Sequence, residues 1–84
     1  MIIDLYEESQ KGLTLIEKAM EKLLMIKSEG LSNSEIAHSL GLESSHQGKQ
    51  INYLTYSVLG IMMEKGSVKK IKNGNKTLYK SNKI

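Results

Sequence analysis

Apolar side chains recur at steps of three and four residues between Ser44 and Gly66. Since that spacing places them on one face of an α-helix, the pattern predicts a long helix over residues 44–66, with Ser44 or Ser45 as its N-cap. The predicted inner face consists of Ile51, Leu54, Val58, Ile61 and Met62. The predicted outer face is polar and carries Lys49, Asn52, Tyr53 and Tyr56, flanked by His46 and Gln50.

A second helical pattern covers residues 13–28. Its apolar residues span nearly half of the helix circumference, whereas one small core requires an arc of roughly 100°. The surplus is expected to pack on the N-terminal segment or on a second copy of the chain, and the pattern leaves both open. Gly12 weakens a helix by about 1 kcal/mol relative to alanine, so we expect a break or kink there. Gly30 is expected to end the helix as a left-handed C-cap.

Residues 31–42 predict a short helix with clear ends. Ser32 and Glu35 match the capping box, in which each side chain satisfies a free backbone N–H at the start of a helix. Gly41 is expected to stop this helix. A capped short helix, a polar loop and a long helix follow one another in the order of a helix-turn-helix, in which the short helix supports the long one.

The C-terminal residues predict a β-hairpin. Val68–Lys72 and Asn75–Lys80 read as strands, and Asn73-Gly74 between them is a strong signal for a two-residue turn. That turn would place Val68 opposite Tyr79 and Lys70 opposite Thr77.

Composition adds a charge asymmetry. The chain has 84 residues and a net charge of +3, and all of its basic residues are lysines. Residues 1–48 hold eight acidic residues and four lysines, whereas residues 49–84 hold eight lysines and one acidic residue. A basic half of this kind favours either a surface for a polyanion or a solvated lysine-rich tail, and charge alone does not separate the two.

The length indicates one domain with a small core. The chain contains no cysteine, so no disulfide framework or thiolate zinc site is expected, which fits a cytoplasmic protein. No apolar run reaches the ~18 residues of a membrane span, so we expect no membrane partner.

The full order of elements resembles the winged helix-turn-helix family. The resemblance covers roughly residues 13–80 and rests on the segments GLSNSEIAHSLGL, SVLGIMMEKG and SVKKIKNGNKTLYK. The segment LGLESSHQGKQINYLTYSVLGIMMEKGSVKK is also similar to the winged-helix module attached to some type II restriction endonucleases. The resemblance implies a mainly α fold with a small β-hairpin: an N-terminal extension (1–12), a three-helix core (13–66) and a wing (67–80) in one domain (1–84).

In this family the long helix enters the DNA major groove and the wing touches the adjacent backbone or minor groove. The resemblance thus implies non-catalytic binding of double-stranded DNA, by a small regulator or by the recognition module of a restriction-type system. The long-helix contacts implied are Ser45, His46, Gln47, Lys49, Gln50, Asn52, Tyr53 and Tyr56. The wing contacts implied are Lys69, Lys70, Lys72, Asn75 and Lys76, and the short helix offers Ser32, Asn33 and Ser34 to a phosphate.

Other interpretations stay open. Tyr53 could cover the edge of the core, and the wing lysines could protect an edge strand from aggregation. A protein–protein adaptor or dimerisation module is the alternative function, with a homodimer through the N-terminal helix as one form of it. We expect no enzymatic activity, no cofactor, no small-molecule ligand and no metal, because the chain holds no catalytic or phosphate-binding motif and His38 and His46 lack partners at ligand spacing.

Overall fold

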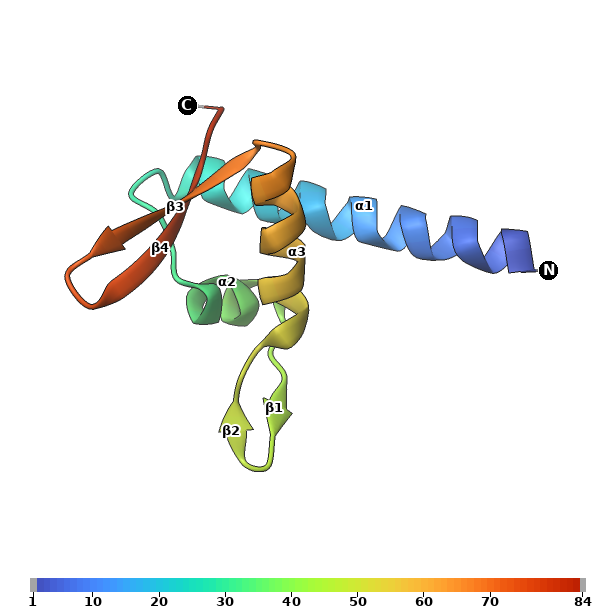
Figure 1. Ribbon diagram of the computed structural model, residues 1–84, viewed down its shortest axis with the longest axis horizontal. Helices are drawn as coiled ribbons and strands as arrows, with labels where there is room; N and C mark the ends of the chain where they lie inside the picture. Colours follow the sequence, from blue (N-terminus) through green and yellow to red (C-terminus); the bar gives the residue numbers. More distant parts are fainter. Residues whose placement is uncertain (1, 84) are drawn as a thin grey trace.

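The computed structural model describes residues 2–83, apart from the side chains of His46 and Gln50. Three helices and a C-terminal hairpin surround one core, and a small second hairpin projects from it (Figure 1). The elements are α1 (Ile2–Ile26), α2 (Asn33–Leu40), β1 (Ser45–His46), β2 (Lys49–Gln50), α3 (Tyr53–Glu64), β3 (Val68–Asn73) and β4 (Lys76–Ser81). The expected mainly α fold with a β-hairpin is confirmed, and the arrangement is consistent with a winged helix.

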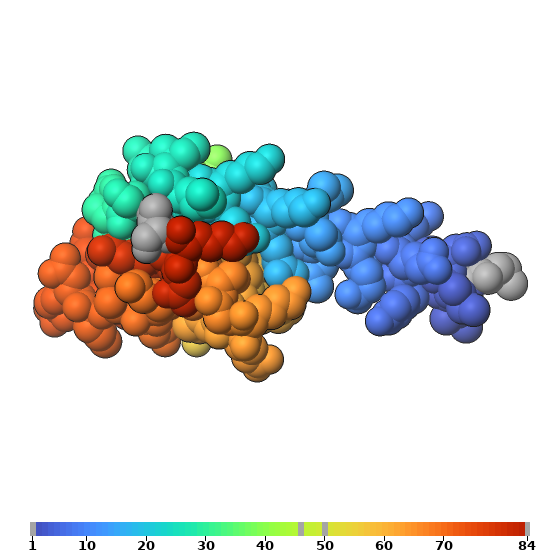
Figure 2. All heavy atoms as spheres, turned by 90° about the horizontal axis from the view of Figure 1, so that it is seen from above, coloured from blue at the N-terminus to red at the C-terminus, as the bar shows by residue number. Residues whose placement is uncertain are grey.

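Helix α1 is one continuous helix that runs through Gly12, so the expected break there is wrong. The C-terminal half packs against the rest of the domain, while the N-terminal half extends away from it without a neighbour (Figures 1 and 2). Residues 2–12 therefore continue the helix and do not fold back to cover the apolar surplus of residues 13–28. The helix predicted from residue 13 begins instead at Ile2, and it ends at Ile26 before Gly30 turns the chain with a φ of 96°.

Helix α2 forms as the sequence predicts. The Ser32 hydroxyl accepts a hydrogen bond from the Glu35 backbone N–H at 3.2 Å, and the Ser32 N–H donates to the Glu35 carboxylate at 2.8 Å. Gly41 ends the helix in the left-handed conformation with a φ of 68°. Both helix ends are set by local chemistry, which is why the sequence identifies them.

The long helix predicted over residues 44–66 is wrong in its first part. Residues 45–50 form the β1–β2 hairpin, and α3 begins only at Tyr53, preceded by Asn52 as its N-cap residue. Residues 44–50 contain no apolar side chain, so no face of a helix there could be buried. Gln47 and Gly48 at the tip both have positive φ, 53° and 81°, which is the requirement of a type I′ turn.

The β3–β4 hairpin forms, with a register that differs from the predicted one. Val68 pairs with Ser81 and Lys70 with Tyr79, so the two turn residues are Gly74 and Asn75. Of these two, only Gly74 has positive φ, at 66°. Compared with the predicted register, the cross-strand partner of each β3 residue is shifted by two positions along β4. A shift of two keeps each side chain on the predicted face of the hairpin.

The core lies where these elements meet. Its buried side chains come from α1, α2, α3 and the hairpin, and are Met20, Leu24, Ile36, Val58, Leu59, Met62, Val68 and Tyr79. A backbone bridge between Leu31 and Tyr79 ties the hairpin to the segment before α2, with hydrogen bonds of 2.8 and 3.1 Å. The wing is therefore held both by its own buried side chains, Val68 and Tyr79, and by the backbone bridge to Leu31.

Candidate nucleic-acid interface

The outer face of α3 is exposed, as predicted for its tyrosines. Tyr53 is 58 % exposed and Tyr56 55 % exposed, so Tyr53 does not cover the core edge. Ser57 and Gly60 share this face, and apart from its chain neighbours and the backbone of α3 itself, no atom lies within 4 Å of the position a Cβ at Gly60 would take. The outer face therefore has two phenols beside two positions where another molecule can approach the backbone closely.

The inner face of α3 differs from the predicted one. Thr55 is fully buried there, whereas Leu54 is 44 % exposed. Thr55 satisfies its hydroxyl by donating to the Asn33 side-chain oxygen at 2.6 Å. This hydrogen bond connects α2 with α3 and removes the cost of burying a hydroxyl.

Asn52 does not lie on the outer face, and its predicted exposure is wrong. The residue is 1 % exposed and has a φ of 57°. Its side-chain oxygen accepts from the Ser44 N–H at 3.0 Å, and its side-chain nitrogen lies 3.5 Å from the Ser34 hydroxyl. With both polar atoms engaged inside the protein, Asn52 joins the base of the β1–β2 hairpin to α2.

The N-terminus of α2 is largely committed to the fold as well. The Ser32 hydroxyl caps the helix, and the Asn33 side-chain nitrogen donates to the Asn52 carbonyl at 3.2 Å. The first backbone N–H of α3 is also occupied within the protein. The Tyr53 N–H donates to the Ser44 hydroxyl at 3.2 Å, although Ser44 lies nine residues before it in the chain. Of the three α2 residues predicted to contact phosphate, Ser34 alone is classed as exposed.

The β1–β2 hairpin carries the predicted contact residues that precede α3. Ser45, Gln47 and Lys49 are exposed on it. The side chains of His46 and Gln50 lie outside the described part of the structure. These five residues belong to a projecting ribbon and not to a helix, so α3 presents only the two tyrosines of the predicted set.

The β3–β4 hairpin exposes Lys69, Lys70, Lys72 and Lys76, which we call the wing lysines, together with Asn75. Lys70 is directly opposite Tyr79, so Lys70 and, two residues further, Lys72 lie on the same hairpin face as the buried Tyr79 and Val68. Burial raises the pKa of the Tyr79 phenol, and the nearby Tyr56 phenol of α3 raises it further. Helix α3 also contacts β3 directly, so the wing lies beside α3.

The other hairpin face approaches α2. Hydrogen bonds from Ser32 lower the pKa of the Glu35 carboxyl, and the Lys76 ammonium lowers it further. Lys76 at the wing tip therefore lies near the start of α2. The β3–β4 hairpin thus contacts both α2 and α3.

Two sets of lysines near the C-terminus differ in whether they pair with an acidic residue. Lys65 pairs with Glu17 at 3.0 Å and Lys83 pairs with Glu21 at 2.8 Å, so these two are bound to α1. Among residues 2–83, no wing lysine takes part in an ion pair within 4.0 Å. Within the described part of the chain, the wing lysines are thus not held in ion pairs, and Lys76 is the one whose charge acts on a nearby carboxylate, that of Glu35.

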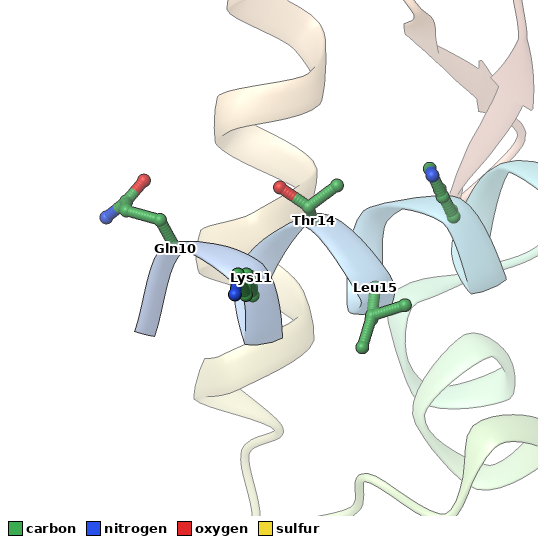
Figure 3. A pocket seen from close by; sticks show the side chains of 5 residues that line it. Gln10, Lys11, Thr14 and Leu15 are labelled. Atoms are coloured by element: carbon green, nitrogen blue, oxygen red, sulfur yellow. The ribbon is translucent and has the colours of Figure 1, made fainter. Parts of the chain in front are cut away.

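The hollows on the described surface lie on α1, away from α3 and the wing. A hollow on α1 is lined by Gln10, Lys11, Thr14, Leu15 and Lys18, all from one helix, and their side chains point in different directions (Figure 3). In the described residues, no three histidine, aspartate or glutamate side chains are grouped to hold a metal ion. None of the helices described is long and apolar enough to cross a membrane.

Comparisons of the chain with family models, curated protein sequences and solved structures give no match. The sequence did not reveal the β1–β2 hairpin or the hydrogen bonds around Asn52. The signal available for the hairpin was a Gln-Gly pair within a purely polar segment, which is weaker than Asn-Gly as a turn signal.

Proposed function

We propose that this chain binds double-stranded DNA, without catalysing a reaction, through the outer face of α3, the β1–β2 hairpin and the wing. The observation that carries the proposal is the group of exposed wing lysines without an acidic partner beside the exposed face of α3. Lysine binds phosphate as a point charge, and phosphate contacts supply much of the affinity for DNA.

The shape of the α3 region fits a major groove. That groove admits an α-helix or a two-stranded β-ribbon, and this chain presents one of each in succession. Because Ser57 and Gly60 have small side chains or none, DNA can approach the backbone of α3 closely there. The hydroxyls of Tyr53 and Tyr56 can bond to phosphates. Sequence preference then depends mainly on Gln47 and Lys49 of the hairpin, because glutamine can bond adenine and lysine can bond guanine.

The salt dependence of binding tests this proposal. Four wing lysines on phosphates give a log–log slope of affinity against salt of about −3.6. The double variant Lys70→Gln/Lys72→Gln is expected to reduce the slope by about 2. The control Lys18→Gln/Lys22→Gln changes the charge equally on the exposed side of α1 and should leave the slope unchanged. Equal slopes for the two variants, or no binding to any duplex at low salt, would overturn the proposal.

Selection from a random duplex pool tests the assignment of sequence preference. Gln47→Ala should flatten the preference at particular positions, whereas Lys72→Gln should weaken binding to all sequences alike. A defined target would support a role as a small regulator or as the recognition module of a restriction-type system. Preserved preference in Gln47→Ala would exclude Gln47 as a reader.

The alternative is a protein–protein adaptor, and one observation favours it. Tyr53 and Tyr56, three positions apart, form an exposed cluster on one side of α3, and tyrosine is enriched at protein interfaces. A protein partner held by this cluster would show little salt dependence and would be lost in Tyr53→Ser/Tyr56→Ser. The wing-lysine variant would not affect such a partner.

A further inference from the structure

The tip of the wing carries an asparagine with an unusual neighbour. Of the five asparagines in the chain, Asn73 is the one followed by glycine. The hairpin does not use this pair as its turn, because Asn73 ends β3 opposite Lys76 and the turn consists of Gly74 and Asn75. All residues from 72 to 76 are exposed. The Asn73 side chain is therefore open to solvent and is not needed to close the turn.

An asparagine followed by glycine can lose its side-chain amide without an enzyme. The backbone nitrogen of Gly74 gives up its proton and attacks Cγ of Asn73. The new N–Cγ bond closes a succinimide ring while the Cγ–Nδ2 bond breaks, and Nδ2 leaves as ammonia with the proton. Water then opens the ring at either carbonyl, which gives aspartate or isoaspartate. Glycine favours the ring closure because it has no Cβ to crowd the attacking nitrogen.

The fold leaves both reacting groups free. Within residues 2–83, neither the Asn73 side chain nor the Gly74 N–H takes part in a hydrogen bond. Three other asparagines have side chains held by hydrogen bonds within the protein, namely Asn33, Asn52 and Asn82. Asn75 is exposed like Asn73, but it is followed by Lys76, whose side chain hinders attack by the backbone nitrogen.

The charge around the wing tip favours this reaction and determines its consequence. Lys72 precedes Asn73, and Lys76 faces it across the hairpin. Their ammonium groups favour the deprotonated nitrogen of Gly74, because a nearby opposite charge stabilises the charged form. A carboxylate at residue 73 would lie on the same hairpin face as Lys76, at the Cβ separation of ~5 Å that directly opposite residues have, where opposite charges attract.

We propose that Asn73 is a site of spontaneous deamidation in the folded chain, and that the carboxylate formed there removes Lys76 from phosphate binding. The effect on DNA rests on the proposed function, since it is the loss of one phosphate contact. At physiological salt, one contact with a slope of about −0.9 corresponds to about a fivefold change in affinity. A chain with intact Asn73 thus binds DNA more tightly than the same chain after deamidation.

Peptide mapping by mass spectrometry tests the modification on the full chain, incubated at neutral and at mildly alkaline pH. Asn73 is expected to convert to aspartate and isoaspartate over days, and faster at the higher pH, because the Gly74 nitrogen must lose its proton. Asn75 is the internal control and should stay intact. The reference is the chain unfolded in guanidinium chloride. Conversion of Asn73 in the unfolded chain alone, or equal conversion of Asn73 and Asn75, would overturn the proposal.

Duplex binding by two variants of residue 73 tests the consequence. Asn73→Asp carries the charge of the product, and Asn73→Gln is the neutral control, because glutamine closes the corresponding ring far more slowly. Asn73→Asp should bind about fivefold more weakly than Asn73→Gln at physiological salt, with a salt slope smaller by about one contact. Equal affinities would show that the new carboxylate does not neutralise Lys76.

The two readouts keep this proposal separate from the DNA-binding proposal. Deamidation is measured by mass spectrometry without DNA. Failure of both variants and of the wild-type chain to bind any duplex would overturn the proposed function and leave the conversion of Asn73 standing. An Asn73 that stays intact in the folded chain would overturn the deamidation proposal alone.

Discussion

The two hairpins differ in what holds them. The β3–β4 hairpin is anchored by apolar side chains, because Val68 and Tyr79 are buried in the core. None of the described side chains of the β1–β2 hairpin lies in the core, and the hairpin is held at its base by hydrogen bonds of Ser44 and Asn52. The comparison teaches that a domain this small positions one exposed element by burial and another by polar contacts at its base.

The largest effect is expected where the wing enters the core. Tyr79→Ala should lower the free energy of unfolding by about 3–5 kcal/mol, because it leaves a cavity among buried side chains. That is a large part of the total stability of a domain of this size. The measurement is urea unfolding followed by circular dichroism.

Thr77→Ala is the control for this variant, since Thr77 lies on the same strand face but is only half buried. It should cost less than about 1 kcal/mol. If the two variants have equal effects, the wing is not anchored through Tyr79, and the contrast between the hairpins fails.

A smaller effect is expected at the base of the other hairpin. Asn52→Ala should cost about 2–3 kcal/mol, because the Ser44 N–H loses its acceptor and alanine is strained at positive φ. Asn52→Gly accepts the positive φ and should cost about 1 kcal/mol less than Asn52→Ala. Urea unfolding of both variants separates the side-chain hydrogen bonds from the backbone strain, and equal costs would show that strain plays no part.

The smallest effect is expected at the tip of the β1–β2 hairpin. Gln47 has a φ of 53°, and asparagine is favoured over other non-glycine residues in a type I′ turn. Gln47→Asn should therefore stabilise the hairpin by about 0.5 kcal/mol, and Gln47→Val should destabilise it. Hydrogen exchange of the hairpin amides is the suitable measurement, and slower exchange in Gln47→Val would contradict the turn assignment.

Local chemistry made part of the fold predictable. The capping box of Ser32 and Glu35, the stop at Gly41 and the hairpin around Gly74 are each decided within a few residues. The wing register was missed because Asn73-Gly74 and Gly74-Asn75 both suit a two-residue turn. The choice between them depends on burial of Tyr79 and on its bridge to Leu31, which no local signal reports.

The candidate site was less predictable for the same reason. Asn52 looks like an outward residue when the long helix is extended to Ser44, and its burial depends on Ser34 and Ser44, which come from elsewhere in the chain. Likewise, Gly12 predicted a break that α1 does not have. Tyr53, Tyr56 and the wing lysines were found because their exposure follows directly from helical and strand periodicity.

The continuous course of α1 fixes how far its N-terminal half reaches from the core. Ile2 is eighteen residues before Met20 on the same helix, or about 27 Å along its axis. Any molecule that binds at the projecting end is therefore held at a set distance and direction from the wing.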